Sequence, residues 1–200
     1  MTQNKVIFTI GRSNGSGGRE IAEALAAKLR IKSYDKLLIS ETAKAAGITE
    51  DQVYEKEEKD GKGLFSFYGV PVSNPLHQYQ FDAIRRLADN DESCIFVGRC
   101  ADYLLAQYPD VIRVFIHASH ESCVERSAKR NSISPKEAAA RVKRKDQERA
   151  MYYQRYTGMV WGNAGNYDLC IDTTKITIDQ ATDLIISYAE MRGYTFTGIQ

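Results

Sequence analysis

Short apolar runs alternate with amphipathic segments along this chain. The runs are continuous and rich in β-prone residues, which is typical of strands buried on both faces. They lie at 6–10, 94–97 and 111–116, while 31–34 is a short β-prone segment and 169–172 a weaker run, and both are also expected to be strands. Between them, apolar residues recur at helical spacing, as at Ile21, Leu25 and Leu29. This alternation predicts an α/β fold in which helices wrap a mostly parallel sheet.

Local capping signals mark the expected starts of the helices. Residues 134–137 read Ser-Pro-Lys-Glu, which combines a serine N-cap, a proline in the first turn and a capping-box glutamate. Residues 177–180 carry Thr and Gln at the same spacing, and so do residues 49–52. Asn74-Pro75 is a further start. The sequence therefore predicts helices that begin at these four places.

The composition is that of an ordinary globular protein. The 200 residues are 43% hydrophobic and 26% charged, which fits a single folded unit over 1–200. No apolar run approaches the roughly 20 residues needed to cross a bilayer, so we expect no membrane-spanning segment. The four cysteines are scattered and the first residues lack the pattern of a signal peptide. A reducing, cytoplasmic location is the expectation.

Charge is unevenly distributed although the net charge is only +1. Residues 126–155 hold ten Lys or Arg against three acids, an excess of seven positive charges, so the rest of the chain sums to −6. A positive field concentrated on one element of a neutral protein favours a small polyanionic ligand over a nucleic acid polymer. A solvated helix face is the alternative.

The strongest chemical signal is the glycine-rich stretch 11–20, which reads Gly-Arg-Ser-Asn-Gly-Ser-Gly-Gly-Arg-Glu. Four glycines in eight residues allow the backbone to turn its N–H groups inward. The helix that follows adds the positive end of its dipole, which suits phosphate. The stretch departs from two known phosphate-binding patterns. Glu20 stands at the position of the third glycine in the dinucleotide fingerprint, and Gly18 stands at the position of the lysine in the P-loop.

Several stretches together resemble the cytidylate kinase-like family of P-loop nucleoside monophosphate kinases. The loop 15–22 is similar to the family's GSGKST-x-A stretch, and Gly98-Arg99-Cys100 to its GRD. Residues 146–149 are similar to the DxxR of the basic lid. The remaining similar stretches are Tyr34-Asp35, 111–130 and 167–188. The order of these stretches, over nearly the whole chain, carries the resemblance.

The resemblance implies a three-layer P-loop NTPase-type fold with a five-stranded, mostly parallel sheet. A helical monophosphate-binding insertion is expected at about 36–92 and a basic lid at about 126–158. It also implies transfer of the ATP γ-phosphate, with Mg²⁺, to a pyrimidine monophosphate, and CMP or dCMP is the acceptor that we expect. The partner is thus a small nucleotide. The aromatic segment 64–68 is a candidate contact with a second copy of the chain.

Site roles follow from the same resemblance. The expected catalytic residues are Arg19, Arg126 and Arg149. The expected cofactor-binding residues are Arg12, Asn14, Gly15, Ser16, Gly17, Gly18, Arg19, Glu20 and Arg130. Acceptor binding is expected at Asp35, Lys36, Arg99, Arg141, Arg144 and Asp146, and Mg²⁺ at Glu20 and Asp35.

Departures from the family pattern keep a second function open. Gly18 removes the lysine that bridges the β- and γ-phosphates, Arg19 replaces the Mg²⁺-binding hydroxyl, and Cys100 replaces the aspartate of GRD. Arg19 restores the lost charge only if its side chain curls back over the loop. The alternative is a non-catalytic nucleotide-binding or regulatory protein on the same fold. A nicotinamide-dinucleotide enzyme is disfavoured by Glu20 and by the basic lid.

Overall fold

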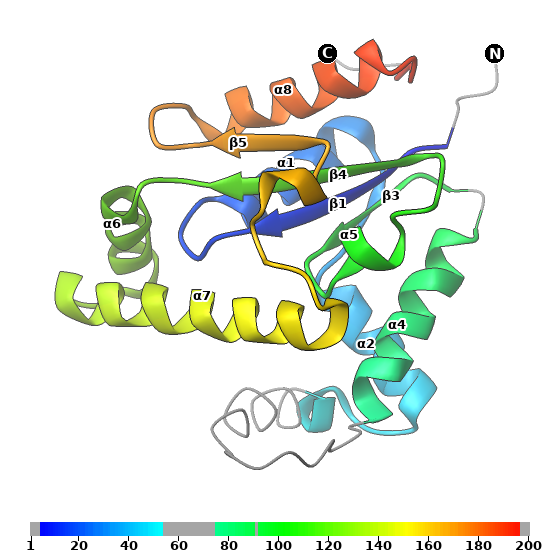
Figure 1. The fold of residues 1–200 in the computed structure, drawn as a ribbon, viewed down its shortest axis with the longest axis horizontal. Coiled ribbons are helices and arrows are strands. Elements are labelled where there is room, and N and C mark those ends of the chain that lie inside the picture. The colour runs from blue at the N-terminus through cyan, green and yellow to red at the C-terminus, as the bar shows by residue number, and fades with distance from the viewer. Residues whose placement is uncertain (1–4, 54–74, 91, 197–200) are drawn as a thin grey trace.

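Five parallel strands form the centre of the molecule (Figure 1). The computed structural model describes residues 5–53, 75–90 and 92–196. The strands are β1 Ile7–Arg12, β2 Lys32–Tyr34, β3 Cys94–Val97, β4 Val111–His117 and β5 Leu169–Asp172. They lie in the order β2-β3-β1-β4-β5, and each neighbouring pair is parallel. The predicted α/β fold is confirmed, and its expected strands differ from the observed ones by at most two residues at either end.

Helices cover both faces of this sheet. They are α1 Gly18–Leu29, α2 Lys36–Ala46, α4 Pro75–Ala88, α5 Ala101–Leu104, α6 His120–Asn131, α7 Pro135–Thr157 and α8 Ile178–Met191. A short 3₁₀ helix, η1 Ala164–Asn166, precedes β5. Within the described part of the chain, no helix has both the length and the apolar character that a bilayer crossing requires.

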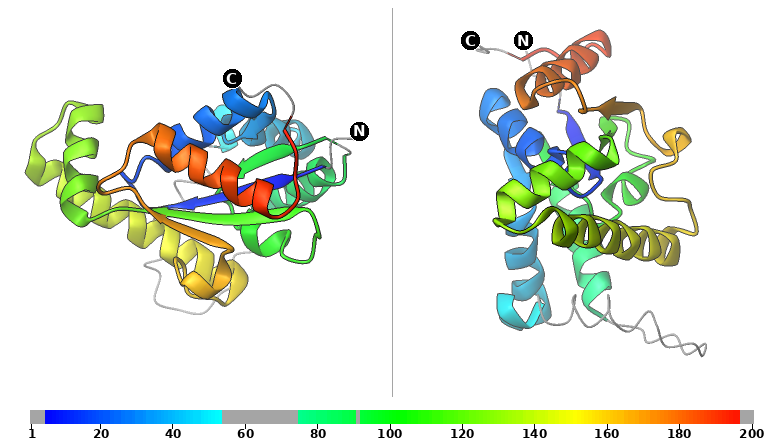
Figure 2. Two further views of the ribbon diagram at one scale, coloured as in Figure 1. Left: turned by 90° about the horizontal axis from the view of Figure 1, so that it is seen from above. Right: turned by 90° about the vertical axis from the view of Figure 1, so that its left-hand side faces the viewer.

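One face of the sheet packs against α1 and α8, which lie together in Figure 2. Phe8 and Ile10 of β1 point to this side, where Leu25 of α1 and Ile185 of α8 meet them. All four side chains are fully buried. Since alternate strand residues point to opposite faces and both faces are covered, the inner strands β1, β3 and β4 are apolar over most of their length.

The opposite face packs against α2, α4 and α5. Ile7 and Phe96 from the strands share one apolar cluster with Leu38 of α2, Ile84 of α4 and Leu105, which directly follows α5. A smaller apolar cluster of Ile39, Ala43, Val53 and Leu76 joins α2 to α4 beyond the sheet. Helices α2 and α4 of the predicted insertion thus pack against each other as well as against the sheet.

Most of the predicted helix starts are confirmed. Ser134 and Glu137 form a complete capping box at α7, and Thr177 and Gln180 form another at α8. Thr49 and Gln52 exchange the same pair of hydrogen bonds. Helix α4 begins at Pro75, whereas Asn74 and the aromatic segment 64–68 lie outside the described residues.

The central core yields a stability prediction. Leu25→Ala leaves a cavity between α1, α8 and the sheet, so it lowers the free energy of unfolding by about 2–5 kcal/mol. Leu184→Ala is the matched control, because Leu184 of α8 is 50% exposed and its loss stays within about 0.5 kcal/mol. Urea denaturation of both variants measures the difference. Equal losses would contradict this assignment of the core.

Candidate functional site

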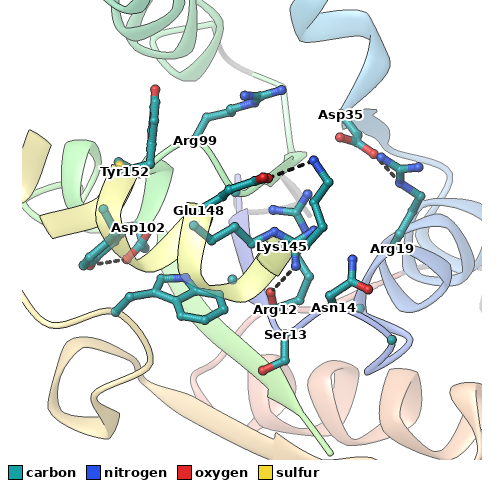
Figure 3. Close-up of a pocket in the computed structure, with 18 of the residues that line it drawn as sticks. Arg12, Ser13, Asn14, Arg19, Asp35, Arg99, Asp102, Lys145, Glu148 and Tyr152 are labelled. Carbon is teal, nitrogen blue, oxygen red and sulfur yellow. Dashed lines mark hydrogen bonds and ion pairs between the residues drawn. The ribbon is translucent and has the colours of Figure 1, made fainter. Parts of the chain in front are cut away.

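A cavity of about 690 Å³ opens where β1 and β3 end (Figure 3). Its walls are the glycine-rich loop after β1, the turn 98–102 after β3, the inserted helices α2 and α4, and the inner side of α7. Ligands of open parallel sheets bind at the carboxyl ends of the strands, and this volume lies in the usual range for small-molecule sites. The position and size predict a binding site for a small molecule.

Glycine is required in the loop for conformation and for space. Gly15 and Gly17 have φ of 84° and 87°, in the left-handed region that side chains rarely adopt. A Cβ at Gly15 would also overlap the carbonyl oxygen of Cys123 on α6. Gly17 is the N-cap of α1, so the positive end of that helix faces the loop.

The loop is held from behind by residues far along the chain. Thr173 Oγ1 donates a hydrogen bond of 2.7 Å to the Ser16 carbonyl oxygen. Arg126 donates to Thr173 Oγ1 at 3.0 Å and to the Thr173 carbonyl at 2.6 Å. Arg126, predicted to be catalytic, therefore lies outside the residues that line the cavity. Its guanidinium contacts oxygens that position the loop.

The described cavity lining is rich in positive charge. Its cations are Arg12, Arg19, Arg99, Arg130, Arg141, Arg144, Lys145 and Arg149. Its carboxylates are Glu20, Asp35, Asp102 and Glu148. Eight positive charges against four negative ones create a field that attracts anions.

Four salt bridges engage part of this charge. Arg19 Nε lies 2.6 Å from Asp35 Oδ2, and Arg130 forms an ion pair with Glu20. Arg144 and Lys145 both pair with Glu148, at 3.1 and 2.9 Å. Figure 3 shows Arg19 turned towards Asp35 at the start of α2. In this arrangement, Arg19 does not curl back over the loop.

The turn after β3 presents Arg99 to the cavity. Gly98, Arg99 and Cys100 have φ of 74°, 58° and 57°, so three successive residues are left-handed. Such a conformation costs about 1–3 kcal/mol for each residue other than glycine, and it is often found at functional sites. Cys100 is buried, and burial raises the pKa of its thiol. Cys100 is thus a packing residue, while Arg99 faces the ligand space.

Helix α7 is attached to the glycine-rich loop at the edge of the cavity. Asp146 Oδ1 accepts a hydrogen bond of 2.7 Å from the Asn14 amide. Arg149 donates to the Arg12 carbonyl at 2.9 Å and lies 3.6 Å from Asp146. Burial raises the pKa of Asp146 and lowers that of Arg149. The predicted pair from the DxxR stretch is therefore seated on the glycine-rich loop.

Sequence reasoning missed several residues of the cavity. Asp102 is 5% exposed and accepts a hydrogen bond of 2.6 Å from the Tyr153 hydroxyl on α7. His77 and Gln80 enter from α4, and Trp161 packs edge-on against Phe115 while lining the cavity. The sequence signal for Asp102 was its place two residues after the GRD-like stretch. The side chain of Lys36 lies outside the described part of the structure.

A sequence model of the cytidylate kinase-like family matches residues 7–175. This chain belongs to the cytidylate kinase-like family. The cytidylate kinase of Methanopyrus kandleri is 26% identical over 189 residues, which cover 90% of this chain and 91% of the relative. The cytidylate kinase of Halobacterium salinarum is 22% identical over 182 residues, which cover 90% and 88%.

Solved structures agree with the family at the level of fold. A protein of Eubacterium ventriosum superposes with a TM-score of 0.72 at 30% identity, and the match covers 93% of this chain and 99% of that one. The shikimate kinase of Bacteroides thetaiotaomicron superposes with a TM-score of 0.57 at 13% identity, over 92% and 98%. The predicted P-loop kinase fold is confirmed.

The two carboxylates predicted to bind Mg²⁺ in this family member are both engaged by arginines. Glu20 pairs with Arg130 and Asp35 with Arg19. Among the described residues, no group of three or more His, Cys, Asp or Glu side chains is arranged to hold a metal ion. Mg²⁺ at kinase sites usually takes one or two carboxylates together with substrate phosphates. As placed, Glu20 and Asp35 do not form such a site unless an arginine is exchanged for the ion.

The contact between Asp102 and Tyr153 predicts a pH-dependent loss of stability. The Tyr153 hydroxyl stabilises the ionised form of Asp102, whose pKa is raised by burial. Tyr153→Phe raises this pKa further. The substitution therefore lowers the free energy of unfolding only slightly near pH 4, which is close to the pKa of an aspartate in the unfolded chain. Near pH 8 it lowers the free energy of unfolding by about 1.5–3 kcal/mol. Urea denaturation at the two pH values measures the change. Tyr188→Phe on α8 is the control, and a loss for Tyr153→Phe that is the same at both pH values would contradict the contact.

Proposed function

We propose that this protein transfers the γ-phosphate of ATP to a pyrimidine nucleoside monophosphate, CMP or dCMP first. One observation carries the proposal: a single cavity joins the glycine-rich loop to Arg99 on the opposite wall, with an excess of cations between them. A kinase of this kind must hold two sets of phosphates close together. Membership of the cytidylate kinase-like family supports the same reaction.

The donor phosphates would lie on the glycine-rich loop. The amides of residues 15–19 and the start of α1 supply hydrogen-bond donors and a positive dipole there. The Asn14 amide is bound to Asp146, so a triphosphate would compete with that carboxylate. Arg130, on α6, would then face the donor phosphates. Mg²⁺ would enter as the counter-ion of ATP.

The acceptor would lie between Arg99 and the inserted helices. A planar guanidinium suits bidentate contact with a phosphate, and the turn 98–100 fixes the direction of Arg99. Asp35, Arg141 and Arg144 line the same space. Asp146 is the candidate for a ribose hydroxyl.

The chemistry requires positioning more than proton transfer. A monophosphate acceptor is ionised at neutral pH, so its oxygen attacks without a general base. The protein must bring donor and acceptor together, neutralise the charge that develops and exclude water. Helix α7 closes one side of the cavity through Arg149 and Tyr153, which makes it the element that shields the reaction.

A non-catalytic nucleotide-binding protein is the second candidate. It is favoured by Gly18, which brings no lysine to the loop, and by Arg19, which is paired with Asp35. Such a protein would bind the same nucleotides without turnover. The acceptor assay separates the two functions.

The kinase proposal predicts acceptor-dependent release of ADP. The assay compares CMP, dCMP, UMP and AMP with an acceptor-free blank, and the pyrimidine nucleotides should give the highest rates. Arg99→Ala should raise KM for the acceptor and leave KM for ATP nearly unchanged, because the two phosphate sites are separate. Arg85→Ala is the matched control, since Arg85 lies on α4 outside the cavity lining.

One result would reject the proposed kinase activity. If no acceptor accelerates ADP release from a protein whose melting temperature still rises with ATP, the non-catalytic function stands. A rise in KM for ATP in Arg99→Ala would reassign Arg99 to the donor site.

The charged lid predicts a change in hydrogen exchange. Residues 126–155 repel one another until phosphates neutralise them, so their amides should exchange more slowly when ATP is bound. Amides of α8 provide the internal control because that helix lies on the far side of the sheet. Unchanged exchange over 126–155 at saturating ATP would favour a solvated charged face.

A further inference from the structure

The absence of a lysine at position 18 leaves a chemical gap in the proposed reaction. A P-loop lysine contacts the β- and γ-phosphates, and Gly18 occupies its position. Arg19 is the neighbouring cation in sequence, but it is bound to Asp35 and its side chain is 48% exposed. Another cation is therefore needed where the phosphoryl group moves.

Arg12 fills the space that a side chain at position 18 would occupy. A Cβ added to Gly18 would lie 2.5 Å from Arg12 Cβ and 3.0 Å from Arg12 Cγ. Real Cβ atoms do not approach other carbons this closely, so the stem of Arg12 and a lysine at position 18 exclude each other. Glycine at 18 and arginine at 12 are two parts of one arrangement.

A second glycine accommodates the other end of the Arg12 side chain. A Cβ added to Gly98 would overlap Arg12 Nη1, and Gly98 also has a left-handed φ of 74°. The guanidinium thus lies directly on the backbone of the turn that presents Arg99. The side chain of Arg12 spans the distance from the glycine-rich loop to the acceptor wall.

The charge of Arg12 is not balanced by an ion pair. Among the described residues, no carboxylate lies within 4.0 Å of its guanidinium, although Asp35 is near enough to raise its pKa. Burial lowers the pKa of Arg12, and Arg149, Arg99 and Arg19 lower it further. An unpaired cation among other cations is stabilised by an incoming anion.

We propose that Arg12 takes the part of the missing P-loop lysine and holds the transferring phosphoryl group. This assignment rests on the proposed kinase function. An acceptor phosphate oxygen forms a bond to the γ-phosphorus while the bond from that phosphorus to the β–γ bridging oxygen breaks. ADP leaves with the electron pair, and Arg12 remains protonated throughout. Its guanidinium contacts the oxygens whose charge changes in this step.

The first test replaces the charge and keeps the stem. Arg12→Gln should lower kcat by about 10²–10³-fold, the usual effect of losing one preorganised donor. It should also abolish the preference for ATP over ADP in binding, measured by calorimetry, because the group that contacts the γ-phosphate is gone. Arg12→Lys, which keeps the charge, should recover part of both. Arg19→Gln should cost less than Arg12→Gln, and Arg85→Gln is the control outside the cavity.

The second test restores the lysine. Gly18→Lys alone should lose activity because its Cβ meets the Arg12 stem. Arg12→Gly combined with Gly18→Lys should regain activity over either single variant. Glycine is needed at position 12, since alanine would keep the Cβ that lies 2.5 Å from the new one.

The outcomes separate this assignment from the kinase proposal. Acceptor-dependent turnover by the wild-type protein tests the kinase function, whereas the ATP preference in binding tests Arg12 whether or not turnover occurs. An unchanged ATP preference in a folded Arg12→Gln would overturn the assignment. So would a larger loss in Arg19→Gln than in Arg12→Gln. Thermal denaturation of each variant shows that it is folded.

Discussion

The Arg12 side chain passes closely by Gly18 and ends on the backbone of Gly98, and the walls of the site are arranged around it. A Cβ at Gly18 would overlap the stem of Arg12, and a Cβ at Gly98 would displace the end of its side chain from this path. The same residue offers its carbonyl to Arg149, which seats α7 on the cavity. Through its side chain and its carbonyl, Arg12 at the end of β1 therefore links the glycine-rich loop, the turn 98–100 and helix α7.

The excess of positive charge makes the cavity attractive to anions. Burial lowers the pKa of Arg12 and of Arg149, and the nearby positive charges of Arg99 and Arg19 lower both further, while Asp35 offsets only part of this effect. The Asp146 carboxylate accepts a hydrogen bond from the backbone amide of Asn14, so it lies where an anionic ligand would bind. A triphosphate would relieve the repulsion and free Asp146 for a hydroxyl of the acceptor.

The sequence was sufficient for features that depend on neighbours along the chain. The buried strands and the capping boxes at Ser134 and Thr177 could be predicted because their causes are local. The resemblance gave the order of the motifs, but not the direction of each side chain. Arg126 turns to Thr173, and Arg19 turns to Asp35, through contacts that depend on packing between distant segments. Asp102 and Tyr153 are 51 residues apart, and neither belongs to a motif.

The role of Arg12 can be tested by a structure with a bound, non-hydrolysable ATP analogue and Mg²⁺. We expect triphosphate oxygens on the amides of residues 15–19, with the γ-phosphate in contact with the Arg12 guanidinium and with Arg99 beyond it. A γ-phosphate held by Arg19, with Arg12 turned away from it, would contradict this role. So would a triphosphate bound outside the cavity.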